Sequence, residues 1–260
     1  DFRDPWTQIG YHKKLMLSSF AQKKHKKLET VVLQTADEIV VTSFKTKTIF
    51  SELTTTPITV LTNGFDFEIT NDSTLDSKFT LSHIGSLLAG RNPYMLWTVL
   101  SDLINESDEF ASAFQLNLIG SVSTEVMDAI RIYGLENYIS NIGYIPHNEV
   151  LEYQKKTQLL LLIEENSKET EYIIPGKLFE YMASKRPIIA IGPEVSDIEK
   201  ILNQTGSGTY FRYDEAAALR TLLLEHFDAY QTQQLNVDSK GLEAYSRKSL
   251  TQQLAQKLLD

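Results

Sequence analysis

The sequence predicts an α/β fold with a Rossmann-like, doubly wound parallel sheet, and two observations carry this prediction. From residue 79 to about residue 240, short apolar runs alternate with amphipathic stretches of helical length. This alternation is typical of right-handed βαβ units and a parallel sheet. The run at 159–163, LLLLI, is apolar at every position, as expected of a strand that helices cover on both faces.

The elements of this region follow in a regular order. Strands are expected at 80–86, 116–122, 138–145, 157–165, 186–192 and 208–211. Helices are expected at 93–105, 124–133, 148–155, 176–184, 196–204 and 214–230, the last two with Ser196 and Asp214 as N-caps. Because ligands of such sheets bind at the carboxyl ends of the strands, a site is expected in the loops that follow them.

Residues 1–78 are organised differently. Helices are expected at 11–36 and 45–53, strands at 38–43 and 58–64, and a polar linker at 66–78. Two strands and two helices do not easily enclose a core, so we interpret 1–78 as the C-terminal remnant of another Rossmann-like domain. The region 79–240 is then the ligand-binding domain. In 241–260, a last helix at 242–259 is expected to pack back on the first segment.

Composition excludes several classes of function. The 260 residues carry a net charge of -9, which argues against binding to the phosphate backbone of nucleic acids. The chain has no cysteine, so disulfides, thiolate catalysis and Cys-ligated zinc are excluded. No stretch reaches the about 18 apolar residues of a membrane helix. The basic run at 23–27 is interpreted as a solvated helix face rather than an anchor for anionic lipid.

Four segments, taken in order and spacing, resemble one family. They are ADEIVVTS at 36–43, ITVLTNGFD at 58–66, HIGSLLAGRNP at 83–93 and PGKLFEYMASKRPIIAIG at 175–192. They resemble the retaining glycosyltransferases of family four, also called group 1, whose GT-B fold has two facing Rossmann-like domains. The resemblance implies that 79–240 binds a nucleotide-sugar donor. It also implies that the chain is the C-terminal portion of a longer protein, most of the acceptor-side domain being absent.

The turn at 175–178 is the centre of the predicted donor site. Pro175, Gly176, Lys177 and Leu178 lie where a strand gives way to a helix, and free N–H groups at a helix start attract an anion. Gly176 permits close approach of the backbone, and Lys177 adds a positive charge. By resemblance, Glu180 binds the ribose hydroxyls. The alternative is an exposed helical ion pair of Lys177 with Glu180.

A second group of candidates follows the first strand of the donor domain. Gly85 and Ser86 stand at the strand end, where small residues let a diphosphate approach. The resemblance implies that Arg91 clamps the diphosphate, and that Arg91 and Lys177 are catalytic because they stabilise the departing diphosphate. An arginine fork suits phosphate oxygens. A surface arginine at a helix entry is the alternative.

Candidates for the nucleobase and the sugar come from two further loops. By resemblance, Ile145 and His147 meet the nucleobase, although a solvated loop histidine is the alternative for His147. The family has two glutamates separated by seven residues; Glu180 matches the second, but Tyr172 stands at the place of the first. Glu171 and Tyr172 are therefore the candidates for the donor sugar. Other acids of the same loop, Glu164, Glu165 and Glu169, are further alternatives for a shifted acid.

The function implied is retaining hexosyl transfer from a UDP-, GDP- or ADP-linked sugar to a saccharide or lipid-linked acceptor. No metal or other cofactor is expected, because basic side chains stabilise the leaving group; the acid-x-acid pattern at 66–68 lies in the linker. A cytoplasmic location is expected, with a peripheral membrane role left open. Alternatives are a nucleotide-sugar-binding module without turnover, an epimerase on the same scaffold and a plain α/β interaction domain.

Overall fold

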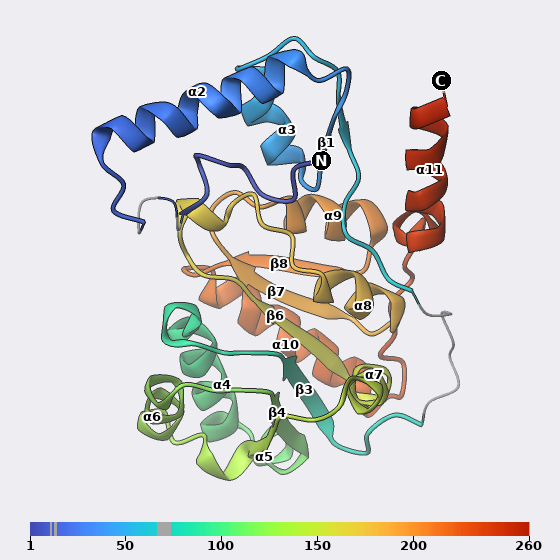
Figure 1. Cartoon of the computed structure of the whole chain (residues 1–260). Helices are drawn as coiled ribbons and strands as arrows, with labels where there is room; N and C mark the ends of the chain where they lie inside the picture. Colours follow the sequence, from blue (N-terminus) through green and yellow to red (C-terminus); the bar gives the residue numbers. More distant parts are fainter. Residues whose placement is uncertain (11, 13–14, 67–73, 260) are drawn as a thin grey trace.

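A computed structural model describes residues 1–10, 12, 15–66 and 74–259. In these ranges the chain forms a six-stranded sheet in the order β5-β4-β3-β6-β7-β8 and a separate two-stranded sheet of β1 and β2. Every strand pair in both sheets is parallel. Helices lie on both faces of the larger sheet (Figure 1). The predicted α/β, Rossmann-like fold is confirmed.

The larger sheet is built from β3 (Phe79–Ile84), β4 (Phe114–Ile119), β5 (Ile139–Gly143), β6 (Leu159–Ile163), β7 (Ile188–Gly192) and β8 (Gly208–Arg212). Its helices are α4 (Tyr94–Glu106), α5 (Asp108–Ala113), α6 (Thr124–Ile132), α7 (His147–Lys156), α8 (Lys177–Ala183), α9 (Asp197–Thr205) and α10 (Ala216–Gln231). Each predicted strand and helix of 79–240 is present. Helix α5 was not predicted; it begins where the Ser107 hydroxyl accepts a hydrogen bond from the N–H of Phe110.

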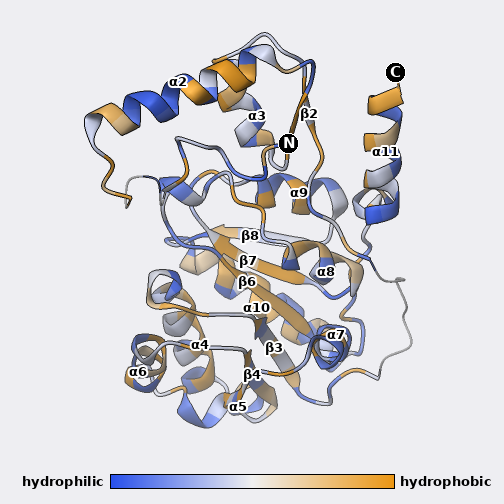
Figure 2. Cartoon of the chain, viewed as in Figure 1, coloured by the Kyte–Doolittle hydropathy of each residue, from blue (hydrophilic) through white to orange (hydrophobic). Residues whose placement is uncertain are grey.

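Strand β6 shows why the sheet is covered on both faces. Leu159, Leu161 and Ile163 belong to a core cluster with residues of α4, α6 and α10. Leu160 and Leu162 point the other way, into a cluster with residues of α8 and α9. Figure 2 shows β6 and β7 as hydrophobic along their length. A strand with no polar face must be sandwiched between two helical layers, as the run of five apolar residues predicts.

The order of the strands reverses between β3 and β6. The chain runs outward from β3 to β4 and β5, then returns to place β6 on the other side of β3. Leu81 pairs with Leu159 and His83 with Leu161 across this junction. In open parallel sheets the loops part at such a switch point and leave a crevice at the carboxyl ends of the strands.

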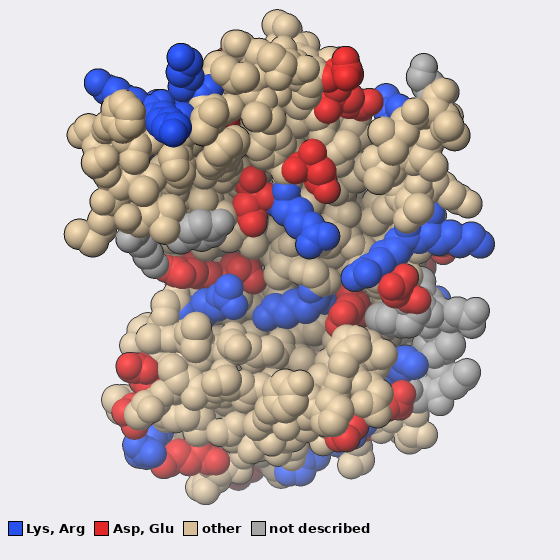
Figure 3. Space-filling model, in the orientation of Figure 1, with Lys and Arg blue, Asp and Glu red and all other residues tan. Residues whose placement is uncertain are grey.

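The first segment has a small core of its own. It contains α2 (Ser19–Thr35), β1 (Ile39–Val41), α3 (Phe44–Ser51) and β2 (Ile58–Val60). Leu33, Ile39, Val41, Phe50 and Ile58 form its buried cluster. The lysines of the basic run are exposed on α2, where basic side chains gather at the upper left of Figure 3. No described helix is long and apolar enough to cross a membrane.

The end of the chain returns to the first segment but not as one continuous helix. A short 3-10 helix, η4 (Leu242–Tyr245), precedes α11 (Arg247–Leu259). The predicted helix at 242–259 is wrong on this point, because Phe65 pairs with the backbone between the two helices. Its N–H donates to the Tyr245 carbonyl at 3.2 Å and its carbonyl accepts from Arg247 at 2.9 Å. Lys257 Nζ of α11 lies 3.9 Å from a carboxylate oxygen of Glu38.

Two further predicted helices differ from the structure. The long helix expected at 11–36 is interrupted at residues 15–18, and α2 begins at Ser19, because the Ser18 hydroxyl accepts from the N–H of Ala21 at 3.3 Å and caps it. Just before α2, Met16 has a left-handed φ of 48°. Residues 11, 13 and 14 lie outside the described residues. Asp214 does not cap α10. Glu215 takes the N-cap position, and its carboxylate accepts from the N–H of Arg212 at 2.7 Å.

Candidate functional site

Two glycines bring the loops after β3 and β4 into contact at the carboxyl edge of the sheet. Gly85 and Gly120 have φ values of 113° and 121°, which L side chains rarely adopt. A Cβ atom on Gly120 would lie 2.6 Å from the carbonyl oxygen of Gly85. The Gly85 N–H donates to the Ile119 carbonyl at 2.7 Å. The close contact between the two loops thus requires a glycine at position 120, a residue that was not among the predicted site residues.

Two of the predicted cationic residues meet at the switch point. Arg91 lies in the 3-10 helix η1 (Ala89–Arg91), and Lys177 is the first residue of α8. Arg91 Nη2 is 3.5 Å from Oε2 of Glu164, the residue that follows β6. Lys177 Nζ donates to the Ile84 carbonyl at 3.5 Å and would be 3.7 Å from a Cβ on Gly85. The loops after β3 and β6 therefore place both cations around one buried carboxylate.

The electrostatics of this group favour an added anion. Burial lowers the pKa of Lys177 to about 8, with the Arg91 charge acting in the same direction and Glu164 opposing it. Burial also raises the pKa of Glu164, against the effect of Arg91 and Lys177. Burial, followed by the Lys177 charge, holds the pKa of His83 well below its ordinary value. Two like charges held close in a partly desolvated site are stabilised by an anion between them.

A second set of polar groups joins α7 to α8. Gln154 Nε2 donates to Oε2 of Glu180 at 3.1 Å. Oε1 of Glu180 lies 3.9 Å from Nε2 of His147, whose side chain is 68% exposed. Ile145 is half-buried against the core beneath. The structure thus brings together Glu180 and the predicted nucleobase loop. The alternative interpretation was an ion pair of Lys177 with Glu180, and no such contact is present among the described residues.

The turn before α8 has fewer free backbone N–H groups than predicted. The N–H of Leu178 donates to the Pro175 carbonyl and that of Phe179 to the Gly176 carbonyl. Leu178 is fully buried, so neither its N–H nor its side chain is available to a ligand. Because α8 has only seven residues, the charges of its neighbours outweigh its dipole. Gly176 is exposed, and a Cβ atom there would meet nothing within 4 Å.

The two candidates for the sugar have partners in the first segment. Glu171 Oε2 lies 3.4 Å from Lys45 Nζ. The buried Tyr172 hydroxyl donates to the Gln8 carbonyl and accepts from the N–H of Gly10, both at 2.9 Å. These contacts tie the loop after β6 to residues 1–66. The remaining candidate, Ser86, is exposed near the start of the loop after β3.

The structure adds two residues that were not predicted as site residues. Glu164 was only one of several alternatives in its loop, and its signal is that it is the first polar residue after the apolar run of β6. Gln154 was not considered; it is buried on the face of α7 that meets α8. A polar residue on the buried face of an amphipathic helix is the signal that indicates it.

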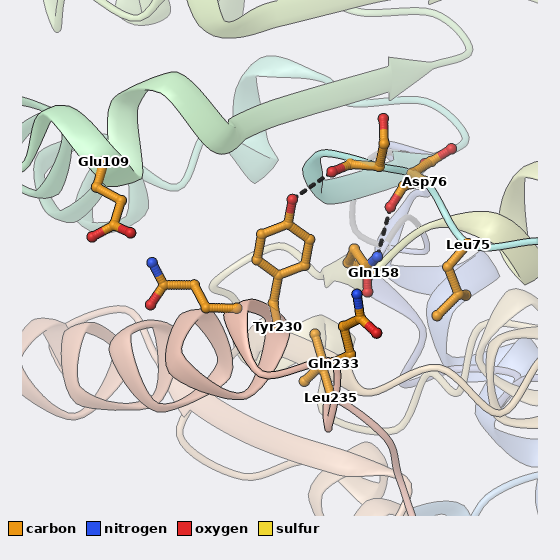
Figure 4. A pocket seen from close by; sticks show the side chains of 9 residues that line it. Leu75, Asp76, Glu109, Gln158, Tyr230, Gln233 and Leu235 are labelled. Atoms are coloured by element: carbon orange, nitrogen blue, oxygen red, sulfur yellow. Dashed lines mark hydrogen bonds between the residues drawn. The ribbon is translucent and has the colours of Figure 1, made fainter.

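A pocket of about 780 Å³ lies at the opposite edge of the sheet (Figure 4). Asp76 and Gln158, which line it, precede β3 and β6, and Tyr230 lies near the end of α10. Gln158 Nε2 donates to the Asp76 carbonyl, and the Tyr230 hydroxyl donates to the Ser77 carbonyl. Because ligands of such sheets bind at the carboxyl edge, this pocket at the amino edge is not the candidate site.

The fold is that of the GT-B glycosyltransferases. No protein-family model and no curated protein matches the sequence. Among solved structures, the chain is similar to a sucrose-phosphate synthase from Thermosynechococcus elongatus, with a TM-score of 0.67, 15% identity, and coverage of 96% of this chain and 65% of that one. It is similar to HepE of Anabaena in complex with UDP, with a TM-score of 0.69, 16% identity, and coverage of 91% and 67%.

A third similar structure is a glycosyltransferase from Rickettsia africae. The TM-score is 0.68 at 14% identity, and the match covers 92% of this chain and 66% of that one. At these identities the likeness shows the fold alone. The chain spans about two thirds of the length of these proteins.

Proposed function

We propose that the chain binds a nucleotide-diphosphate sugar and serves retaining transfer of its hexosyl group to a saccharide or lipid-linked acceptor. The observation that carries this proposal is the placement of Arg91 and Lys177 at the switch point between β3 and β6. A crevice at the carboxyl edge with two converging cations suits a diphosphate. The similar fold of HepE, a structure in complex with UDP, supports the same class of ligand.

In this proposal each group has one task. The Arg91 guanidinium and the Lys177 ammonium neutralise the charge that develops on the departing diphosphate, so that basic side chains replace a metal ion. Glu180 accepts hydrogen bonds from the ribose hydroxyls, and the loop with Ile145 and His147 holds the nucleobase. UDP, GDP and ADP are all candidates for the nucleotide. Residues 79–240 form the donor domain, and 1–78 with 241–260 form the acceptor side.

One observation favours a second candidate, a nucleotide-sugar-binding module without turnover. Tyr172 stands at the place of the acid expected near the transferred sugar, and both Tyr172 and the neighbouring Glu171 have partners in the first segment. Without an acid at the sugar, the chain would bind the donor but transfer nothing. Formation of a glycoside on a saccharide acceptor, with release of the nucleoside diphosphate, separates the two, because only the transferase catalyses this transfer.

The binding proposal is tested by Glu180→Gln, with inorganic pyrophosphate as the matched ligand. Loss of the carboxylate is expected to weaken the binding of nucleoside diphosphate by about tenfold or more, because hydrogen bonds to charged groups contribute about 1.5–3 kcal/mol. Pyrophosphate has no ribose, so its affinity should stay the same. Glu149→Gln on the exposed side of α7 is the control variant. Equal weakening of both ligands would remove Glu180 from the ribose site.

A further inference from the structure

A buried carboxylate stands between the two cations, and the proposed function leaves it without a task. The Glu164 side chain is 2% exposed. Neither of its carboxylate oxygens has a hydrogen-bond partner among the described residues. Its ion pair with Arg91 is long, at 3.5 Å. An ionised carboxylate without hydrogen bonds in a buried site is costly, so this arrangement needs a reason beyond stability.

Two cations and two phenols are the main titratable neighbours of Glu164. The Tyr213 hydroxyl donates to the backbone carbonyl of Glu164 at 2.7 Å. The titratable groups that face the carboxyl are Arg91 of η1, Lys177 of α8, Glu165, Tyr210 of β8 and Tyr213. His83 of β3 faces the same two cations, and its Nε2 also lacks a partner among the described residues. Unpaired buried polar atoms therefore gather at this one place.

We propose that Glu164 is the internal counter-ion of Arg91 and Lys177, that the diphosphate of the donor replaces it, and that Glu164 takes up one proton as the donor binds. This inference rests on the proposed function. The two cations and the carboxylate sum to one positive charge, whereas the diphosphate of a nucleotide sugar adds two negative ones. An ionised Glu164 would then repel the diphosphate, and a proton from the solvent removes this repulsion.

In this account Glu164 is a positioning residue that holds the two cations ready for the donor. Burial already raises the pKa of Glu164, and an incoming diphosphate raises it further. Proton uptake on binding means that the affinity for the donor increases as the pH falls through the pKa of Glu164 in the complex. Because the pKa of Lys177 is about 8, this lysine is charged before and after binding in slightly acidic solution and takes up no proton there.

The test is calorimetric titration with UDP-, GDP- and ADP-glucose at about pH 6.5, in two buffers with different ionisation enthalpies. The diphosphate of these donors is a diester, without the titration near pH 6 of a terminal phosphate. We expect uptake of up to one proton per donor bound, and affinity that falls by up to about tenfold per pH unit over the pH range in which this uptake is measured. Glu164→Gln should abolish the uptake and bind the donor at least as tightly at neutral pH. Glu165→Gln, the same change one residue further on, should keep it.

The outcomes separate the two proposals. Donor binding to the wild-type chain without proton uptake contradicts the role of Glu164 and leaves the proposed function standing. Uptake that persists in Glu164→Gln assigns the proton to another group and also overturns the inference. If none of the three donors binds, the proposed function fails and the inference with it. Titration of the wild-type chain in the two buffers measures the proton uptake even if Glu164→Gln does not fold.

Discussion

At the scale of single residues, the burial of the Lys177 ammonium reduces the stability of the fold. Its folded-state pKa is about 8 instead of 10.5, so the unfolded chain binds more protons between these two values. The free energy of unfolding should therefore rise with pH across this window, and the destabilisation is fully present below about pH 8. Lys177→Met should be more stable than the wild type at neutral pH and should lack this rise.

Urea unfolding between about pH 7 and 10 measures the effect as a difference between the two proteins. Lys240→Met, at an exposed position, is the control and should keep the pH dependence of the wild type. An equal pH dependence in wild type and Lys177→Met would show that this ammonium is not desolvated as described.

The sequence predicted the positions of some candidate site residues better than those of others, for a physical reason. Arg91 stands shortly before one expected helix and Lys177 in the first turn of another, and the parallel topology brings such strand-to-helix turns to one edge. The task of a buried polar residue depends on its partner in space. Gln154 is explained only by Glu180 on another helix, and Tyr172 only by the backbone of residues 8–10. No local pattern predicts such pairs.

At the scale of elements, the contact of the loops after β3 and β4 depends on Gly120. Gly120→Ala adds a Cβ that would lie 2.6 Å from the Gly85 oxygen, at a φ of 121°. We expect a loss of more than about 2 kcal/mol in stability from strain and overpacking together. Affinity for nucleoside diphosphate should also fall, because the loop leading to Arg91 is displaced.

Gly134→Ala is the matched control for this change. Its φ of 70° is also left-handed, but a Cβ there meets nothing within 4 Å. Gly134→Ala should lose only about 1–2 kcal/mol of stability, which is the cost of a left-handed backbone conformation for alanine. Its affinity for the ligand should stay unchanged. Urea unfolding and ligand titration of both variants measure the difference. Equal losses of stability would mean that the close approach at Gly120 does not matter.

The Tyr172 hydroxyl makes two of the described contacts between the loop after β6 and the first segment. Tyr172→Phe removes the hydrogen bonds to the Gln8 carbonyl and from the Gly10 N–H. We expect a loss of about 1–3 kcal/mol, since two hydrogen bonds of about 0.5–1.5 kcal/mol each are lost. Amide exchange at residues 8–10 should become faster while the strands stay protected. Tyr144→Phe, at an exposed position, should change neither; unchanged exchange in Tyr172→Phe would contradict this fixing role.

At the scale of the whole molecule, the hydrophobic pattern predicted the fold more accurately than it predicted where the helices begin and end. An apolar run such as 159–163 has one stable place, in the middle of a sheet covered on both faces. Helix ends depend on single caps. Ser18 starts α2 late, and pairing with Phe65 interrupts the last helix. Both effects come from contacts that hydrophobic periodicity does not contain.

The central claim is that a nucleoside diphosphate binds between Arg91 and Lys177 at the switch point of the sheet. Calorimetric titration of the wild-type chain and of the double variant Arg91→Met/Lys177→Met with UDP, GDP and ADP tests it most directly. We expect at least one diphosphate to bind the wild type, and the folded double variant to bind it at least about a hundredfold more weakly, as two charge-assisted contacts are lost. Absence of binding at millimolar concentration, or equal affinity in both proteins, would contradict the claim.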